Sequence, residues 1–233
     1  MNKKIIIQIP FNVQGFNKTN EFDEEWIRYR LKIFCDYSLK SLVNQTNQHF
    51  TAMLRTRNQT LKTVLDEVGG KLPDNVIVVA GNYDVSIRRC IEGYNYLYLV
   101  RLDSDDCLVD YYVDLLQNYI PKIDTEVLIT QCCYDYDIIQ ERLCKFWYRS
   151  PQGFALIYRV DDYLEKKRYQ LKNGHGGAIL LKHEILKGYN YLNTIHRKNN
   201  ESFFHTSDTK NRKNLIEISD EREKQRILRS FGI

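Results

Sequence analysis

Three aspartates, Asp103, Asp105 and Asp106, lie within a run of four residues of the 233-residue sequence. They directly follow the largely apolar run 97–102, which is typical of a buried β-strand. Carboxylate oxygens are the ligands that Mg²⁺ and Mn²⁺ prefer, and these ions often share their ligand shell with phosphates of a bound molecule. Because they stand two positions apart at a strand end, Asp103 and Asp105 are predicted to hold one such ion. The alternative is a solvated acidic turn in which Asp106 caps the next helix.

The segments before the aspartates alternate between strands and helices. Continuous apolar runs predict buried strands, and apolar residues at helical spacing predict helices. Asp23 stands where it would cap the first helix, and a break is predicted near Ser38. The predicted strands are 4–9, 50–56, 76–80 and 97–102, and the predicted helices are 24–43, 61–68 and 84–93. This order is typical of a parallel sheet with helices on both faces, and ligands of such folds bind at the carboxyl ends of the strands.

The second half of the chain has a less regular pattern. It predicts strands at 127–133 and 154–158, helices at 111–119, 184–188 and 220–229, and a glycine-rich segment at 174–181. With 4 prolines and 11 glycines in the sequence, no stretch is typical of a long flexible linker. We therefore expect one α/β domain over residues 1–233, with a mostly parallel central sheet flanked by helices.

Composition narrows the class of ligand. The net charge of +4 suits an anionic ligand but lies below the charge density of a dedicated nucleic-acid-binding protein. The 17 tyrosines and 10 phenylalanines could stack on bases or sugars, or could reflect genome composition. The six cysteines form no CxxC pair, so we read them as reduced and expect a cytoplasmic location. No run approaches the roughly 20 apolar residues of a membrane span, so contact with a membrane would be peripheral.

Three stretches, covering about the first half of the chain, carry a resemblance to a known family. They are Ile9–Asn12, then Glu25-Trp26 with Arg28, Arg30, Phe34, Ser41-Leu42 and Gln45-Thr46, and finally Arg101–Asp106. In these the chain resembles the rhamnosyl transferase family, within the GT-A glycosyltransferases, in which a strand delivers a DxD motif to the nucleotide-sugar site. Arg101 directly before Leu-Asp-x-Asp-Asp is the most family-like detail.

The resemblance implies a metal-dependent, inverting transfer of a sugar, rhamnose among the candidates, from a dTDP- or UDP-sugar to a glycan or polysaccharide acceptor. Residues 1–106 would then form the nucleotide-sugar-binding half, and 107–233 the acceptor-side half. It also implies site residues: Pro10, Phe11 and Asn12 beside the nucleoside, Arg101 and either Arg88 or Arg89 on the nucleotide, and His205 as a further metal or diphosphate ligand, with His196 as a weaker rival. One departure is that the region after the second strand, 53–58, lacks the acidic residue that often holds the base.

Other candidate residues are less constrained by the sequence. Arg30 lies in a helix whose other face is apolar, where it either reaches a phosphate or is solvated. His175 stands among glycines that let a ligand approach, so it is a candidate for contact with a sugar. An inverting transfer needs a carboxylate base, for which Asp161, Asp162 and Glu201 are candidates, Glu201 on a loose resemblance to inverting relatives.

Two alternatives remain. A nucleotidyltransferase would share the βαβ layout, but residues 13–19 hold just one glycine and one lysine where a glycine-rich, basic loop is expected. A noncatalytic sugar- or nucleic-acid-binding module could also keep this fold. Its basis would be the basic tail, where acidic residues interleave and favour a solvated helix over a contact with nucleic acid or an anionic membrane.

Overall fold

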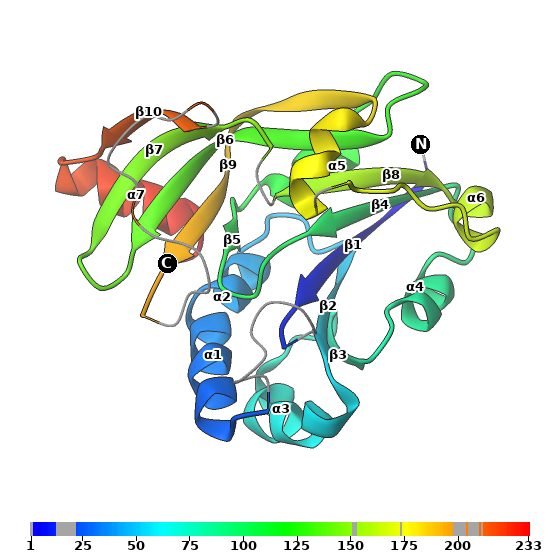
Figure 1. The fold of residues 1–233 in the computed structure, drawn as a ribbon, viewed down its shortest axis with the longest axis horizontal. Coiled ribbons are helices and arrows are strands. Elements are labelled where there is room, and N and C mark those ends of the chain that lie inside the picture. Colours follow the sequence, from blue (N-terminus) through cyan, green and yellow to red (C-terminus); the bar gives the residue numbers. More distant parts are fainter. Residues whose placement is uncertain are drawn as a thin grey trace.

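The computed structural model describes residues 2–12, 22–150, 153–172, 174–197, 204, 210 and 212–233. Its strands form one sheet in the order β10-β7-β6-β8-β4-β1-β2-β3, with β9 paired to β6 and β5 paired to β9. Helices lie on both faces of this sheet (Figure 1). The predicted α/β class, with a central sheet flanked by helices, is confirmed.

The first half of the chain builds the parallel part of the sheet. Its strands are β1 (Lys3–Pro10), β2 (Phe50–Thr56), β3 (Val76–Ala80) and β4 (Tyr96–Arg101), and its helices are α1 (Glu24–Asp36), α2 (Ser38–Val43), α3 (Leu61–Val68) and α4 (Asp84–Cys90), with short 3₁₀ turns η1 (Asn58–Thr60) and η2 (Gly69–Lys71). β1 pairs in parallel with both β2 and β4, and β3 follows β2. Asp23 caps α1 as predicted, and the predicted break falls at Tyr37.

Side chains alternate between two cores because β1 is covered on both faces. Ile5, Ile7 and Ile9 join the core under α1, α2 and α3, whereas Ile6 joins the core under α4. All four isoleucines are fully buried. Figure 1 shows α1 and α3 on one side of the sheet and α4 on the other. This double cover explains why the strand reads as a continuous apolar run.

The second half of the chain continues the sheet mainly with antiparallel strands. β8 (Phe154–Arg159) pairs with β4, β6 (Val127–Asp137) pairs with β8, and β7 (Arg142–Tyr148) and β10 (Arg212–Glu217) extend the edge. The remaining elements are β5 (Cys107–Leu108), α5 (Tyr112–Asn118), α6 (Val160–Leu164), η3 (Gly174–Leu180), β9 (His183–Ile195) and α7 (Glu221–Ser230). The helix predicted at 220–229 is thus confirmed, and α6 and β10 were not foreseen.

The predicted helix at 184–188 is wrong, because these residues belong to β9. This strand pairs in parallel with β6 along most of its length, so backbone pairing outweighs a short helical pattern. The pairing register shifts beside Gly188, whose φ of +94° a residue with a side chain rarely adopts. Beyond the bulge, Tyr191 and Thr194 of the same strand contact Asp106.

Two further findings bear on the sequence-based expectations. All six cysteines are free. Within the part of the chain that the structure describes, no helix combines the length and the apolar character that a membrane crossing needs.

Candidate functional site

The carboxyl ends of β1, β2 and β4 meet at one edge of the sheet. Pro10 pairs with Arg55 on β2, and Gln8 pairs with Arg101 on β4. The chain that follows each strand therefore leaves the sheet at the same edge, which carries Asn12 after β1 and Asp103 after β4. This is the edge where ligands of open parallel sheets bind.

Asp103 lies at the rim of this edge. Its side chain is 24% exposed, and its Oδ1 accepts a 2.9 Å hydrogen bond from Nη2 of Arg101. Among the described residues, no hydrogen bond reaches its second carboxylate oxygen. Asp103 and Arg101 thus form a partly exposed, half-open ion pair, in which one carboxylate oxygen of Asp103 is accessible to a ligand arriving from solvent.

Asp105 is held in a buried cluster instead. Its Oδ2 accepts a 3.0 Å bond from Nη1 of Arg30 and lies 3.2 Å from Nε2 of His196, while Nη2 of Arg30 donates to Oγ of Ser104 at 3.1 Å. Arg30, Asp105 and His196 are each less than a tenth exposed. Burial opposes the charged form of Asp105, but the Arg30 guanidinium and the His196 contact outweigh it and lower the pKa of Asp105 to about 2.

Helix α1 places Arg30 in this cluster. The side chain of Asp23 caps the first turn of the helix, and Trp26, Ile27 and Leu31 anchor its buried face. The Arg30 guanidinium lies 5.8 Å from the ring of Trp26, which contributes to holding it. Of the two sequence-based alternatives for Arg30, the solvated one is wrong.

Asp106 does not cap a helix, which corrects that expectation. It is 2% exposed, its Oδ2 accepts from the hydroxyl of Tyr191, and its Oδ1 accepts from the backbone N–H of Thr194 at 3.0 Å. Burial and the charges of Asp105 and Asp103 raise the pKa of Asp106 well above its usual value, which favours the neutral acid. The reason for the difference is β9, which passes beside the turn and supplies partners for a buried carboxyl group.

Asn12, after β1, is also buried and fully engaged. Its Nδ2 donates to Oγ1 of Thr60 at 2.8 Å, and its Oδ1 accepts from Oγ1 of Thr56 at 2.8 Å and from the backbone N–H of Arg57 at 3.2 Å. Phe11 packs on Trp26 with ring centroids 6.1 Å apart. The Asn12 hydrogen bonds hold the ends of β1 and β2 together. Pro10, the last residue of β1, lies opposite Arg55 of β2 in the same strand pair.

Arg55 and Tyr83 form a pair that sequence reasoning missed. The Arg55 guanidinium lies 4.8 Å over the Tyr83 ring, and Nε of Arg55 and the hydroxyl of Tyr83 are buried with no hydrogen-bond partner among the described residues. Burial raises the pKa of Tyr83, while the charges of Arg55 and Arg101 oppose that shift. Buried donors without partners are costly, and a bound anion or carbonyl oxygen would satisfy them.

The structure does not gather every predicted site residue. Arg88 on α4 donates to Asp84 at 2.6 Å and to the backbone oxygen of Leu164 at 3.1 Å, so it lies with α6 and not with the acidic segment. His175 lies on η3, where its backbone oxygen is 3.5 Å from Oγ of Ser150. Asp161 and Asp162 are on α6, at the far end of β8 from the acidic segment. Glu201 and His205 lie outside the described residues, as do residues 13–19.

Three partners of the acidic segment come from β9 and the residue that follows it. The sequence analysis assigned no role to Tyr191 and Thr194, which lie beyond the helix predicted at 184–188, and His196, directly after β9, was only the weaker rival of His205. Their proximity follows from the pairing of β5 with β9, in which Cys107 faces Leu192. The sequence gives no local signal for this strand pairing, because the two paired segments, at Cys107 and Leu192, are far apart along the chain.

The acidic segment offers a divalent cation few protein ligands. In the described ranges, no group of three or more His, Cys, Asp or Glu side chains is arranged to hold a metal ion. Mg²⁺ nevertheless binds commonly through one or two carboxylates together with water and phosphates. The partly exposed carboxylate of Asp103 fits that mode, whereas an ion at Asp105 would compete with Arg30 and His196.

The comparisons with known proteins give only a distant likeness. No protein-family model matches the sequence, and no similar chain is found among curated proteins. The structure is similar to S. aureus TarS 1-349 with a TM-score of 0.44 at 15% identity, and to its complex with UDP with a TM-score of 0.45 at 15% identity; each match covers 82% of this chain and 60% of that one. A crystal structure from Desulfovibrio desulfuricans G20, described as that of a nucleotide-diphospho-sugar transferase, matches with a TM-score of 0.35 at 11% identity. This match covers 82% of this chain and 80% of that one. This chain thus spans less than two thirds of the TarS chains.

Proposed function

We propose that this chain is a nucleotide-sugar-dependent glycosyltransferase whose donor diphosphate binds at Asp103 and Arg101. The observation that carries the proposal is the half-open Arg101–Asp103 ion pair at the carboxyl end of β4, beside the ends of β1 and β2. The donor would be a dTDP- or UDP-sugar, rhamnose among the sugars, and the acceptor a glycan or polysaccharide.

Each part of the edge has a role in this proposal. Arg101 and Arg55 are cations that would neutralise charge on a diphosphate, and the Tyr83 hydroxyl is a buried donor beside them. Phe11 and the Asn12 network would shape the nucleoside side. Arg30 and His196 would not touch the donor, since they hold Asp105 and so fix the turn that presents Asp103.

A divalent cation, Mn²⁺ or Mg²⁺, belongs to the proposal. When bound, it would neutralise the charge that builds on the leaving diphosphate. Asp103 would hold it, and Asp105 remains a predicted second ligand. Inversion, Glu201 or His175 as the catalytic residue at the acceptor, Arg88 on the nucleotide and His205 on the metal all remain predictions of the resemblance.

The test is a thermal-shift screen of UDP, dTDP, GDP and CDP with and without Mn²⁺. A ligand that binds only the folded state raises the melting temperature by mass action. We expect one nucleoside diphosphate to stabilise the wild type in the presence of Mn²⁺, and Asp103→Asn to lose that shift. The matched control is Asp66→Asn, which removes an exposed carboxylate on α3 and should keep the shift.

Turnover then separates the enzyme classes. The substrate to use is a sugar nucleotide with the same base as the nucleoside diphosphate that stabilises the protein. A glycosyltransferase releases a nucleoside diphosphate, whereas a nucleotidyltransferase releases pyrophosphate. A stable Asp103→Asn variant that binds and turns over the donor as the wild type does would refute the assigned role of Asp103. The absence of any nucleotide-dependent shift would favour a noncatalytic binding module.

A further inference from the structure

Helix α7 carries an arginine stripe made of Arg222, Arg226 and Arg229. These positions are four and three residues apart, so at about 100° per residue they lie on one face of the helix. All three side chains are exposed. The opposite face holds Ile227 and Leu228, which are buried in the main core. The arginine stripe therefore points directly away from the protein.

The acidic residues of α7 do not neutralise the stripe. Glu221 forms an ion pair with Lys224 at 2.6 Å and accepts a hydrogen bond from Gln225, and Glu223 forms an ion pair with Lys145 of β7 at 2.8 Å. Within the part of the chain that the structure describes, no ion pair joins a carboxylate to any arginine of the stripe. The three positive charges of the stripe thus have no paired carboxylate among the described residues.

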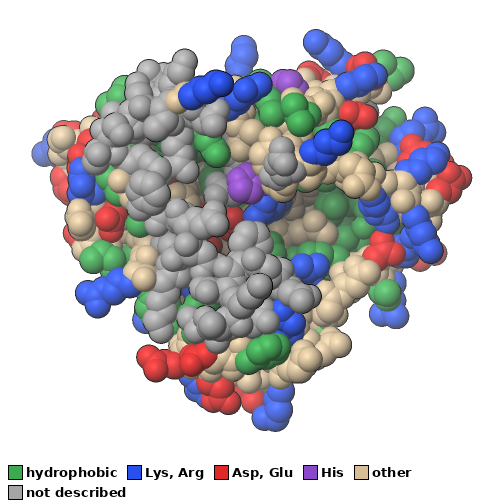
Figure 2. All heavy atoms as spheres, viewed as in Figure 1, with side chains coloured by type: hydrophobic (Ala, Val, Ile, Leu, Met, Phe, Trp, Pro, Cys, Tyr) green, Lys and Arg blue, Asp and Glu red, His purple; other side chains and the backbone are tan. Residues whose placement is uncertain are grey.

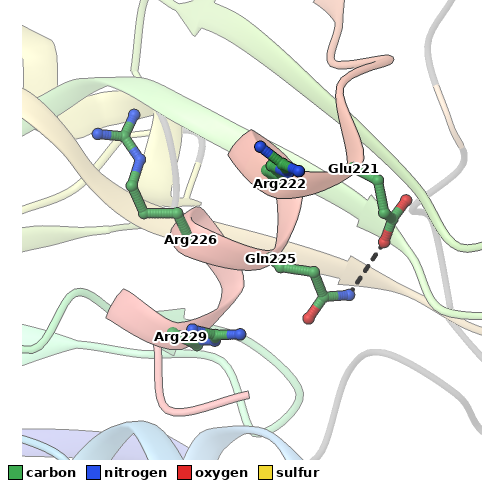
Figure 3. A pocket seen from close by; sticks show the side chains of 5 residues that line it. All are labelled: Glu221, Arg222, Gln225, Arg226 and Arg229. Carbon is green, nitrogen blue, oxygen red and sulfur yellow. Dashed lines mark hydrogen bonds between the residues drawn. The ribbon is translucent and has the colours of Figure 1, made fainter.

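The stripe also borders a hollow on the helix surface. Figure 3 shows Arg222, Arg226 and Arg229 extending from successive turns of α7, with Gln225 turned toward Glu221 at the side. The hollow that they line with Glu221 and Gln225 has a volume of about 290 Å³. Guanidinium groups with unused donors around such a space suit phosphate oxygens, which Arg binds through two parallel hydrogen bonds.

We propose that α7 is an electrostatic docking surface for the headgroups of an anionic phospholipid membrane. Basic residues near an anionic leaflet each add a small attraction that salt screens, so three give a reversible contact. The exposed face of α7 carries arginines and no large apolar side chain, so it would lie on the headgroups without inserting into the lipid tails.

A membrane fits the stripe better than a nucleic acid does. The stripe rises only about 10 Å along the helix, at 1.5 Å per residue, which would span few phosphates of a nucleic acid. Charged side chains of both signs are interspersed over the face shown in Figure 2, so that face offers no broad basic surface. A lipid surface presents many headgroups in one plane and so can satisfy a short linear stripe.

The experiment is co-sedimentation of the whole chain with vesicles. One set contains about 30% phosphatidylglycerol in phosphatidylcholine, and the other contains phosphatidylcholine alone. We expect binding to the anionic vesicles only, and loss of this binding as salt rises from about 50 mM to about 500 mM. The triple variant Arg222→Gln, Arg226→Gln, Arg229→Gln should bind about a hundredfold more weakly.

The matched control removes three positive charges elsewhere. Lys32, Lys62 and Lys71 lie on α1, α3 and η2, are exposed, and can all be replaced by Gln. Strong binding by this variant, with weak binding by the arginine variant, supports the proposal. Equal loss in both variants would show a response to net charge alone and overturn it. The proposal would also be overturned if the wild type failed to bind anionic vesicles. This holds even if the arginine stripe were found to bind a single-stranded oligonucleotide. It also holds whatever the nucleotide screen shows, since that screen tests a different site.

Discussion

The two ends of the acidic segment differ although they carry the same side chain. Asp103 is a quarter exposed and shares one oxygen with Arg101, whereas Asp105 and Asp106 are buried and bonded to α1 and β9. The difference arises because β9 covers only the second part of the turn. A DxD pattern therefore predicts acidic residues at the end of a strand, but it does not predict which of their carboxylates is accessible to a ligand.

The buried end is itself divided. Arg30 lowers the pKa of Asp105 and so favours its charged form. Asp106 is likewise buried but contacts no cation among the described residues, so its pKa is raised and its neutral form is favoured. The charged carboxylate thus lies against a guanidinium, and the neutral form of Asp106 avoids burying a second negative charge beside it. Substitutions at Arg30, Asp105, Asp106 and Asp103 would each test this division.

Removing Arg30 should have the largest effect on stability. Arg30→Met removes the guanidinium from the buried Asp105 carboxylate, and breaking a buried pair in this way typically costs about 3–5 kcal/mol. Urea unfolding at pH 7 measures the change. On the same helix, Arg28→Met removes an exposed ion pair with Glu67 and should cost less than about 1 kcal/mol. Similar small losses in both variants would contradict the buried-pair interpretation.

Acid should remove the contribution of Asp105. Its pKa in the folded protein, about 2, lies below the ordinary value of 3.8, so its stabilisation is present above about pH 4 and is lost as pH falls through about 2. Asp106 has the opposite sign, so the wild type alone does not isolate the effect. The melting-temperature advantage of wild type over Asp105→Asn should therefore shrink between pH 4 and pH 2. A constant advantage would mean that Asp105 is not a charged partner of Arg30.

Replacing Asp106 should cost little. Asp106→Asn keeps an acceptor for the Thr194 N–H and reverses the bond with Tyr191, since the Asn amide would donate to the Tyr191 oxygen. It also removes the cost of keeping an acid neutral at pH 7. We expect the free energy of unfolding to stay the same or to rise by about 1 kcal/mol in urea titrations. A loss of more than about 2 kcal/mol would instead indicate that the folded protein needs a charged Asp106.

Asp103 should matter least for stability. Its ion pair with Arg101 is partly exposed, so Asp103→Asn should change the free energy of unfolding by less than about 1 kcal/mol. The same variant is the one expected to lose the Mn²⁺-dependent nucleotide shift. A variant that unfolds readily would place Asp103 with the buried end and remove the contrast between the two ends.

Much of the parallel half could be predicted from the sequence. Runs such as Ile5–Ile9 are buried on both faces, so their apolar pattern is local and unambiguous. The same logic failed at 184–188, where a short mixed pattern fits helix or strand and pairing with β6 decides. It also gave no sign of Arg55 and Tyr83, whose contact joins the ends of β2 and the start of α4.

The sequence alone determined that three aspartates follow a buried strand in a βαβ chain, because periodicity and chain order are local properties. Only the tertiary structure decided which aspartate faces solvent. Arg30 lies 75 residues before Asp105 and His196 lies 91 residues after it, and their contact depends on how α1 and β9 pack around the turn. Periodicity reports that a position is buried, whereas the partner that makes a buried charge tolerable is set by distant side chains that packing brings together.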